Sequence, residues 1–250
     1  MPNYIFYLGN LMKILVLQHV RVEHPGIFRT FLREDGHDWV PVFLDEGEKL
    51  PALEDFDALW VMGGPMDVWE EKEYPWLREE KAFIKDAVEV RGMPFLGLCL
   101  GHQLLAEALG GKCGPAKIAE IGVKNVQLTE EGATGIIFDA IPTNFACLQW
   151  HSAEVTIMPK GSVCLATSPD CIVQAMKWGP RAYSLQFHLE VESDTVDNWA
   201  QIPSYANDLE GALGKSGVSD LKTACEHKIS DFSILAERFY LNWLQTSAQV

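Results

Sequence analysis

The stretch MPFLGLCLGHQLLAEALGG, Met93–Gly111, joins a short apolar run to a helical pattern through a turn that contains a lone cysteine. PFLGLC predicts a buried strand, and LGHQLLAEAL has the apolar spacing of a helix, which two glycines then end. Cys99 lies at the junction, with Gly97 and Gly101 two residues away on either side. A sharp turn from strand to helix crowds the backbone, and glycines at these two positions relieve that crowding.

Cys99 has two interpretations at this junction. It is either a small apolar residue packed beneath the turn or a nucleophile that the turn presents. A helix N-terminus places partial positive charge and free N–H groups beside the sulfur, which favours the thiolate. GLCLG is also the thiol counterpart of the G-x-S-x-G elbow of serine hydrolases, and the N–H of Leu100 can donate to an oxyanion on a substrate. The turn alone leaves both interpretations open, so partner residues must decide between them.

Short apolar runs alternate with helical patterns over the first two thirds of the chain. The predicted strands are Lys13–Gln18, Trp39–Phe43, Ala58–Gly64 and Pro94–Cys99, and the predicted helices are Gly26–Asp35, Trp76–Val90 and Leu100–Leu109. Fully apolar strands that alternate with helices predict a parallel sheet covered on both faces. Shorter β-like runs follow, at Gly122–Leu128, Val163–Thr167, Ile172–Trp178 and Ala182–Phe187. We therefore expect an α/β fold with an open, mostly parallel, flavodoxin-like sheet and helices on both faces.

The sequence has no internal repeat and no clear domain boundary. We expect a single domain over residues 13–250 and an N-terminal extension over residues 1–12. Helical character returns from Ser193 onward as a C-terminal tail, which includes an amphipathic helix over Asp231–Leu244. The Gly- and Ser-rich segment Gly211–Ser219 is predicted to be a loose connection within that tail.

Composition limits the partners and the compartment. The formal net charge of −15 argues against nucleic acid or an anionic membrane surface as the main partner. No stretch approaches the roughly 20 apolar residues that a membrane-spanning helix needs, and the N-terminus lacks the features of a signal peptide. The six cysteines have no C-x-x-C spacing, so they are expected to be free thiols in a reducing cytosol. We therefore expect a cytoplasmic protein with no nucleic-acid or membrane partner.

A cysteine nucleophile needs a base, usually histidine, and a group that orients this base. A solvated role is the default expectation for His19, His24 and His37. His188 differs, because it lies in the strand-like run YSLQFHLEVES, two residues before Glu190. Residues i and i+2 of a strand point to the same face, so Glu190 can accept a hydrogen bond from one imidazole nitrogen while the other faces the sulfur. A surface His–Glu pair is the alternative, and the GLCLG elbow in the same chain favours the functional interpretation.

Together, GLCLGHQ and the later QFHLEV resemble the motifs of the class I glutamine amidotransferases, and most closely those of the glutaminase domain of GMP synthase. The resemblance extends from about Lys13 to Glu192. Members of this family use a Cys-His-Glu triad. The resemblance therefore implies that Cys99 is the nucleophile, His188 the base and Glu190 the carboxylate that orients it.

Three further stretches fit this resemblance. VMGGPMDV is similar to the family's glycine-proline loop, which implies that the Gly64 N–H completes an oxyanion hole with Leu100; an ordinary β-turn is the alternative. Gln103 corresponds to the family's glutamine-binding residue, and QWHSAEV resembles the stretch that holds the glutamine backbone, which implies a substrate contact for Ser152. The family usually has His-Pro-Glu, and Leu189 replaces the proline here, which removes some backbone stiffness but no reacting atom.

The sequence also indicates what the chain does not contain. It has neither the Ser-Gly-Gly-x-Asp-Ser loop of an ATP pyrophosphatase nor a G-x-x-x-x-G-K-[ST] motif, so we expect only the amide-cleaving half of a synthase. No cysteine–histidine cluster has metal-ligand spacing, and neither a metal nor a cofactor is expected. The favoured function is cleavage of the side-chain amide of glutamine through a Cys99 thioester, with ammonia released to a separate synthetase. The alternatives are a stand-alone γ-glutamyl peptidase or hydrolase, and a non-catalytic binding protein on the same fold.

Overall fold

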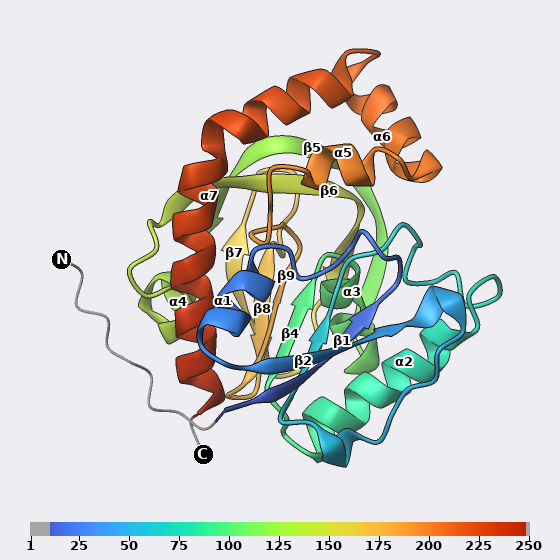
Figure 1. The fold of residues 1–250 in the computed structure, drawn as a ribbon, viewed down its shortest axis with the longest axis vertical. Helices are drawn as coiled ribbons and strands as arrows, with labels where there is room; N and C mark the ends of the chain where they lie inside the picture. The colour runs from blue at the N-terminus through green and yellow to red at the C-terminus, as the bar shows by residue number, and fades with distance from the viewer. Residues whose placement is uncertain (1–10, 249–250) are drawn as a thin grey trace.

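A nine-stranded sheet runs through residues 11–248, the part of the chain that the computed structural model describes (Figure 1). The strands are β1 Lys13–Gln18, β2 Asp38–Phe43, β3 Ala58–Val61, β4 Phe95–Leu98, β5 Lys112–Leu128, β6 Asn144–Ile157, β7 Ser162–Thr167, β8 Ala175–Trp178 and β9 Ala182–Leu185. Their order in the sheet is β2-β1-β3-β4-β9-β8-β7-β5-β6. The predicted extension, residues 1–12, lies mostly outside the described residues.

The sheet has a parallel and an antiparallel part. β2, β1, β3, β4 and β9 pair in parallel, and the strands from β9 to β6 pair antiparallel. The expected α/β fold with an open, mostly parallel, flavodoxin-like sheet is confirmed. The extent of the antiparallel part was not predicted: β5 begins ten residues before the predicted run 122–128, and no run was predicted for β6. In β6, the buried polar residues Gln149 and His151 interrupt the apolar pattern that marks a strand.

Helices cover both faces of the sheet, as predicted. They are α1 Phe28–Glu34, α2 Trp76–Lys85, α3 Leu100–Ala108, α4 Glu130–Thr134, α5 Thr195–Trp199, α6 Pro203–Leu213 and α7 Gly217–Ser247. Short 3₁₀ helices lie at Leu44–Glu46, Leu53–Asp55 and Ile136–Phe138, and a π-helical turn over Asp86–Val90 continues α2. α1 and α7 pack on one face, where Trp60 of β3 contacts Phe28 and Trp243. Leu59 and Val61 point the other way, into the apolar cluster beneath α2 and α3.

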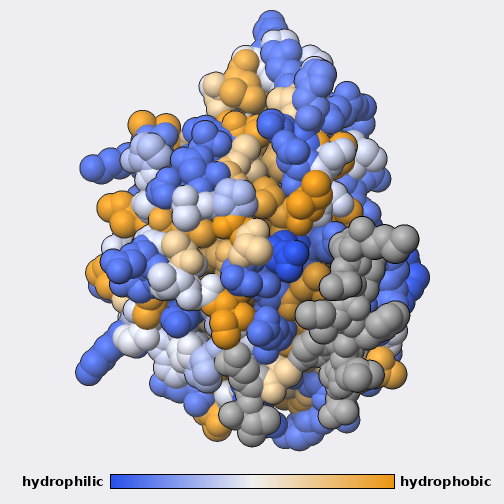
Figure 2. All heavy atoms as spheres, turned by 90° about the vertical axis from the view of Figure 1, so that its left-hand side faces the viewer, coloured by the Kyte–Doolittle hydropathy of each residue, from blue (hydrophilic) through white to orange (hydrophobic). Residues whose placement is uncertain are grey.

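The long helix α7 contains the predicted amphipathic helix over residues 231–244. Its buried side chains recur at helical spacing and include Phe232, Ala236, Phe239 and Trp243. Figure 2 shows the side of the molecule on which α7 lies, where hydrophilic and hydrophobic residues are interspersed. Among the described residues, no helix is both long and apolar enough to cross a membrane.

The connection between α6 and α7 is shorter than the predicted loose segment 211–219. α6 continues to Leu213 and α7 begins at Gly217, with Gly214 at φ +79° between them. A Cβ on Gly217 would lie 2.4 Å from Leu209 Cδ2, so the two helices pack closely at this turn. The glycines therefore allow a tight turn, and the prediction of a loose connection is wrong.

The carboxyl ends of three neighbouring strands meet at one edge of the sheet. β3 leads to Gly64, β4 leads to Cys99, and β9 leads to His188. In open α/β sheets, ligands bind outside the carboxyl ends of the strands. The topology thus brings together the segments that the sequence motifs singled out.

Candidate active site

Cys99 occupies a strained turn between β4 and α3. Its backbone angles are φ +49° and ψ −102°, which residues with a Cβ rarely adopt. A Cβ on Gly97 would lie 2.5 Å from the carbonyl oxygen of Gly101, and a Cβ on Gly101 would lie 2.1 Å from that of Val61. The predicted need for both glycines is confirmed by these close backbone contacts. Strain of this kind at a nucleophile position is a feature of functional turns.

His188 and Glu190 lie in the segment that follows β9, which ends at Leu185. The prediction that they belong to a strand is wrong, because the chain leaves the sheet here: the His188 N–H donates to the carbonyl of Leu148 in a single bridge to β6. The predicted pairing is present all the same. His188 Nδ1 lies 2.6 Å from Glu190 Oε1, and both side chains are buried.

The surroundings of His188 favour its protonated form. Burial lowers the pKa of His188, but the charge of Glu190 and hydrogen bonds with Cys99 and Glu190 outweigh this effect and hold the pKa well above its usual value. The ring of Trp199 packs edge-on against the imidazole at 4.6 Å between centroids. The Trp199 Nε1–H donates to the carbonyl of Val22. These contacts hold the imidazole between a carboxylate and a thiol, where it can receive a proton from the sulfur.

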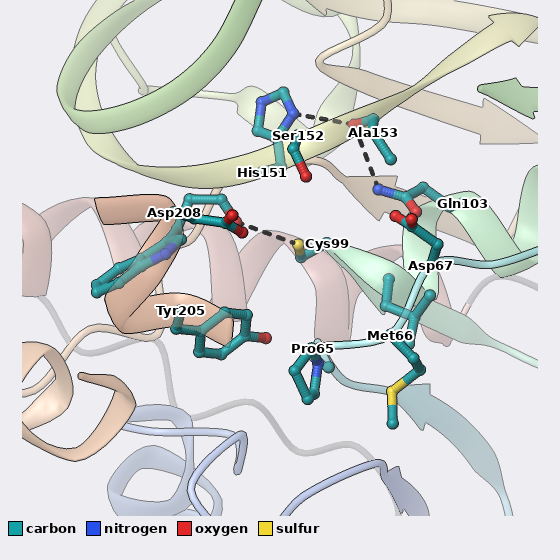
Figure 3. Close-up of a pocket in the computed structure, with 13 residues that line it drawn as sticks. Pro65, Met66, Asp67, Cys99, Gln103, His151, Ser152, Ala153, Tyr205 and Asp208 are labelled. Carbon is teal, nitrogen blue, oxygen red and sulfur yellow. Dashed lines mark hydrogen bonds between the residues drawn. The ribbon is translucent and has the colours of Figure 1, made fainter. Parts of the chain in front are cut away.

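Cys99 faces a pocket that is lined by the loop after β3, the first turn of α3, β6 and α6 (Figure 3). Gly64 and Leu100 are both among its lining residues. Within residues 11–248, neither of their N–H groups donates to an acceptor of the protein. For Leu100 this follows from its place in the first turn of α3, because the first N–H groups of a helix have no partner within it. Two free N–H groups beside a thiol can stabilise a developing oxyanion.

Gln103 and Ser152 line the same pocket (Figure 3). Gln103 Nε2 donates to the carbonyl of Ala153 at 3.4 Å and to Gln186 Oε1 at 3.3 Å, so the Gln103 carbonyl oxygen is left for a ligand. Gln186 in turn donates from Nε2 to Cys99 Sγ at 3.7 Å. The sequence interpretation missed Gln186, although a fully buried glutamine two residues before His188 in an apolar run is an unusual feature.

Helix α6 forms a wall of the pocket that the sequence interpretation also missed. Tyr205 and Asp208 line this wall (Figure 3), and the Tyr205 hydroxyl donates to Glu23 Oε1 at 2.6 Å. Glu23 is 2% exposed, and its carboxylate lies within 4.8 Å of the ligand atoms of His188 and Glu190. No local pattern marks these residues, because their position depends on packing between the C-terminal tail and the loop after β1.

Glu23 makes the stability of the fold depend on pH. Burial raises the pKa of Glu23 to about 7 from 4.5, although the charge of His188 and the Tyr205 hydroxyl lower it. The folded state therefore binds this proton more tightly than the unfolded chain. Its stabilising contribution is complete below about pH 4.5 and is lost as the pH rises toward about 7.

Glu23→Gln imitates the protonated acid in shape and cannot ionise. Between about pH 5 and about pH 8, we expect the free energy of unfolding of the wild-type protein to fall by on the order of 3 kcal/mol because Glu23 ionises. Glu23→Gln should not show this loss. Melting temperatures of both proteins across this range test the expectation, with the exposed Glu210→Gln of α6 as the control. Parallel melting curves for wild type and Glu23→Gln would contradict it.

Two of the histidines expected to be solvated are buried. His19 is 0% exposed, with Nδ1 2.8 Å from the carbonyl oxygen of Gly63 and Nε2 2.9 Å from Glu80 Oε1. His37 is 6% exposed, and its Nδ1 accepts a hydrogen bond from the Met12 N–H. The expectation is wrong for both. His19 follows β1 and is enclosed by the loop after β3 and by α2, whereas His37 lies between α1 and β2, where the backbone before β1 packs against it.

In the described part of the chain, two groups of three side chains each place atoms that could bind a metal ion within 4.8 Å of one another. The first group consists of Glu23, His188 and Glu190, and the second of Glu120, His151 and Cys171. In the second group, burial raises the pKa of the Cys171 thiol to about 12, and Glu120 accepts a hydrogen bond from Gln174 at 2.6 Å. Metal binding needs a deprotonated thiol, so hydrogen bonding accounts for this group better than a metal does. All six cysteines are free thiols.

The chain is similar to known proteins over most of its length. The sequence model of the family described as glutamine amidotransferase class-I matches residues 37–199, which include Cys99, His188 and Glu190. The chain is 31% identical over 210 residues to the glutamine amidotransferase-like protein YfeJ of Salmonella typhimurium, over 82% of this chain and 85% of that protein. It is 32% identical over 152 residues to the glutamine-hydrolyzing GMP synthase subunit of Sulfolobus acidocaldarius, over 60% and 76% of the two chains. A solved structure of a glutamine amidotransferase from Thermotoga maritima matches with a TM-score of 0.84 and 28% identity, over 96% of this chain and 100% of that one.

Proposed function

Because this chain belongs to the class-I glutamine amidotransferase family, we propose that it hydrolyses the amide bond at the γ-carboxyl group of glutamine or of a γ-glutamyl compound. One observation carries the proposal. Cys99 lies in a strained elbow at a pocket, beside a histidine whose Nδ1 is 2.6 Å from Glu190 Oε1. Such a series of nucleophile, base and orienting carboxylate supports acyl transfer through a covalent intermediate.

The first half of the reaction forms a thioester. Cys99 transfers its proton to His188 while the sulfur attacks the γ-carbonyl carbon, and the π electrons of the carbonyl move to its oxygen. The N–H groups of Gly64 and Leu100 donate to this oxyanion. The imidazolium of His188 then protonates the amide nitrogen, the C–N bond breaks, and ammonia or an amine leaves.

The second half consumes water. His188 takes a proton from a water molecule, whose oxygen adds to the thioester carbon, and the oxyanion forms again. The C–S bond then breaks as the carbonyl re-forms, and the sulfur of Cys99 recovers the proton from His188. The γ-carboxylic acid leaves and gives its proton to water. In both halves Glu190 accepts a hydrogen bond from Nδ1–H of His188, which fixes the tautomer and stabilises the imidazolium.

Gln103 and Ser152 are proposed to bind the amino-acid end of the substrate. Ser152→Ala is expected to raise KM by about tenfold and to change kcat much less, because a hydrogen bond to a charged group that is equal in ground and transition states affects binding alone. Steady-state kinetics with the glutamine or γ-glutamyl compound that the wild-type protein turns over test this expectation. A loss confined to kcat would place Ser152 at the reacting amide instead.

The fate of the ammonia distinguishes two candidate functions. The similarity to a glutamine-hydrolyzing GMP synthase subunit supports release of ammonia to a separate synthetase chain. The wall formed by Tyr205 and Asp208 of α6 favours the second candidate, a stand-alone γ-glutamyl hydrolase, since here the chain itself supplies this side of the pocket.

Ammonia and glutamate release by the purified chain test both candidates, with glutamine beside a panel of γ-glutamyl peptides and amines and with Cys99→Ala as the background. Turnover of glutamine supports the glutaminase. Turnover of γ-glutamyl peptides, with glutamine a poor competitor, supports the stand-alone hydrolase. Absence of turnover for every compound would contradict the proposal and leave a binding protein on this fold.

A further inference from the structure

The peptide bond between Gly63 and Gly64 is held from inside the protein by a buried ion pair. His19 Nδ1 lies 2.8 Å from the carbonyl oxygen of Gly63, and His19 Nε2 lies 2.9 Å from Glu80 Oε1. Both side chains are 0% exposed. The imidazole also stacks on Trp76 of α2, with 5.5 Å between centroids and 16° between planes. The His19 side chain therefore links the loop that follows β3 to the end of β1 and to α2.

Both ring nitrogens of His19 face oxygen atoms, one of the Gly63 carbonyl and one of the Glu80 carboxyl group, which suits a doubly protonated ring. Burial lowers the pKa of His19, but the charge of Glu80 and the hydrogen bonds to Glu80 and Gly63 outweigh it and raise the pKa. The Gly63 carbonyl thus accepts a hydrogen bond from a cation in a dry site, where such bonds are stronger than between neutral groups.

Fixing this carbonyl also fixes the amide on the other side of the same peptide unit. In a trans peptide the C=O of one residue and the N–H of the next point in opposite directions, and the described residues contain no cis bond. The Gly63 carbonyl points toward His19, so the Gly64 N–H points away from it. Gly64 lines the pocket beside Cys99, and its N–H has no acceptor within residues 11–248.

Without an anchor, this peptide unit would be free to turn. Glycine populates positive and negative φ about equally, so a bond between two glycines can flip at little cost. A flip would remove one oxyanion donor from the pocket.

We infer that His19, supported by Glu80, is a positioning residue that presets the Gly64 N–H as an oxyanion donor, so that no partner chain is needed to align it. The inference rests on the proposed function, in which Gly64 stabilises the oxyanion. It also predicts that the isolated chain is competent for acyl transfer.

Asparagine and leucine at position 19 form a matched pair for the test. Both have nearly the same shape and both lose the stacking on Trp76, but only asparagine keeps an N–H donor near the position of Nδ1. They are compared in a Glu80→Gln background, which avoids an unpaired buried carboxylate. His19→Phe serves as a second donor-free variant should the leucine protein not fold.

The orientation of the Gly63–Gly64 peptide can be followed by NMR, without any measurement of activity. The sequence has two Gly–Gly bonds, Gly63 to Gly64 and Gly110 to Gly111. A protein labelled with 13C-carbonyl and 15N glycine therefore gives two carbonyl–nitrogen correlations, and the second is an internal control. We expect the first correlation to move or broaden with His19→Leu, and to stay near its reference position with His19→Asn.

Kinetics supply the second readout. Relative to Glu80→Gln alone, His19→Leu is expected to lower kcat by about 10²-fold, as for the loss of one oxyanion donor, with KM little changed. His19→Asn should recover most of kcat. Alkylation of Cys99 by iodoacetamide forms no oxyanion, so its rate should be similar in all three proteins.

If the Gly63–Gly64 correlation of His19→Leu keeps the position it has with His19 present, then His19 does not hold this peptide in place. Equal kcat values for the asparagine and leucine proteins would overturn the positioning role. Failure of the proposed function is recognised separately, because the wild-type protein would then turn over neither glutamine nor any γ-glutamyl compound. The NMR correlations would still decide whether His19 holds the Gly63–Gly64 peptide.

Discussion

Replacing Cys99 with alanine is expected to reduce turnover by about 10⁵-fold or more, to the background of the assay, because no thioester can form. The fold should persist. Alanine has the same Cβ as cysteine, so it adds no strain at φ +49°, and the missing sulfur leaves only a small gap at the pocket floor. Ammonia release and a thermal melt on the same preparation test both parts of the expectation.

Two further variants show whether the effect belongs to the sulfur of Cys99. Cys99→Ser should be nearly as inactive, since a hydroxyl is a much weaker nucleophile than a thiolate in a site arranged for sulfur. Cys225→Ala on α7 removes a buried thiol whose pKa burial raises to about 12, and it should keep most of the activity. Near-normal turnover by either Cys99 variant would rule out the thioester mechanism.

The features that the sequence predicted correctly depend on neighbours in the chain. The elbow needs glycines at fixed distances from Cys99, and the packing of Gly97 on Gly101 explains why. His188 and Glu190 are two residues apart, so their pairing was recognised even though the strand assigned to them was wrong. The apolar runs of the parallel strands likewise predicted the order of strands and helices.

The features that were missed depend on contacts between distant segments. Glu23 and Tyr205 are 182 positions apart in the chain, and each is an ordinary polar or aromatic residue in its local context. The sequence predicts a solvated His19, since a histidine after a strand is usually exposed, yet Glu80 of α2 provides its charge partner. Buried polar residues of this kind oppose the hydrophobic pattern, so only the folded chain reveals them.

Glu190→Gln is expected to lower kcat by about 10³–10⁴-fold with a much smaller change in KM. Glutamine keeps the size of the side chain but can present its NH2 group to His188 Nδ1, which then favours the wrong tautomer. The variant also lacks the negative charge that raises the pKa of His188. The pKa of His188 should therefore fall, and less of the imidazolium should be present at about pH 7 to hold the proton of Cys99.

The alkylation rate of Cys99 by iodoacetamide separates this role from a simple substrate contact. In Glu190→Gln the rate near neutral pH should fall together with kcat, because the thiolate loses the imidazolium that stabilises it. Glu192→Gln, two residues further along, is the matched control: Glu192 pairs with Arg29 at 2.6 Å, and its replacement should change neither rate by more than about threefold. A change confined to KM, with alkylation unaffected, would mean that Glu190 binds the substrate and that another carboxylate orients the base. Glu23, within 4.8 Å of the same imidazole, would then be the residue to test.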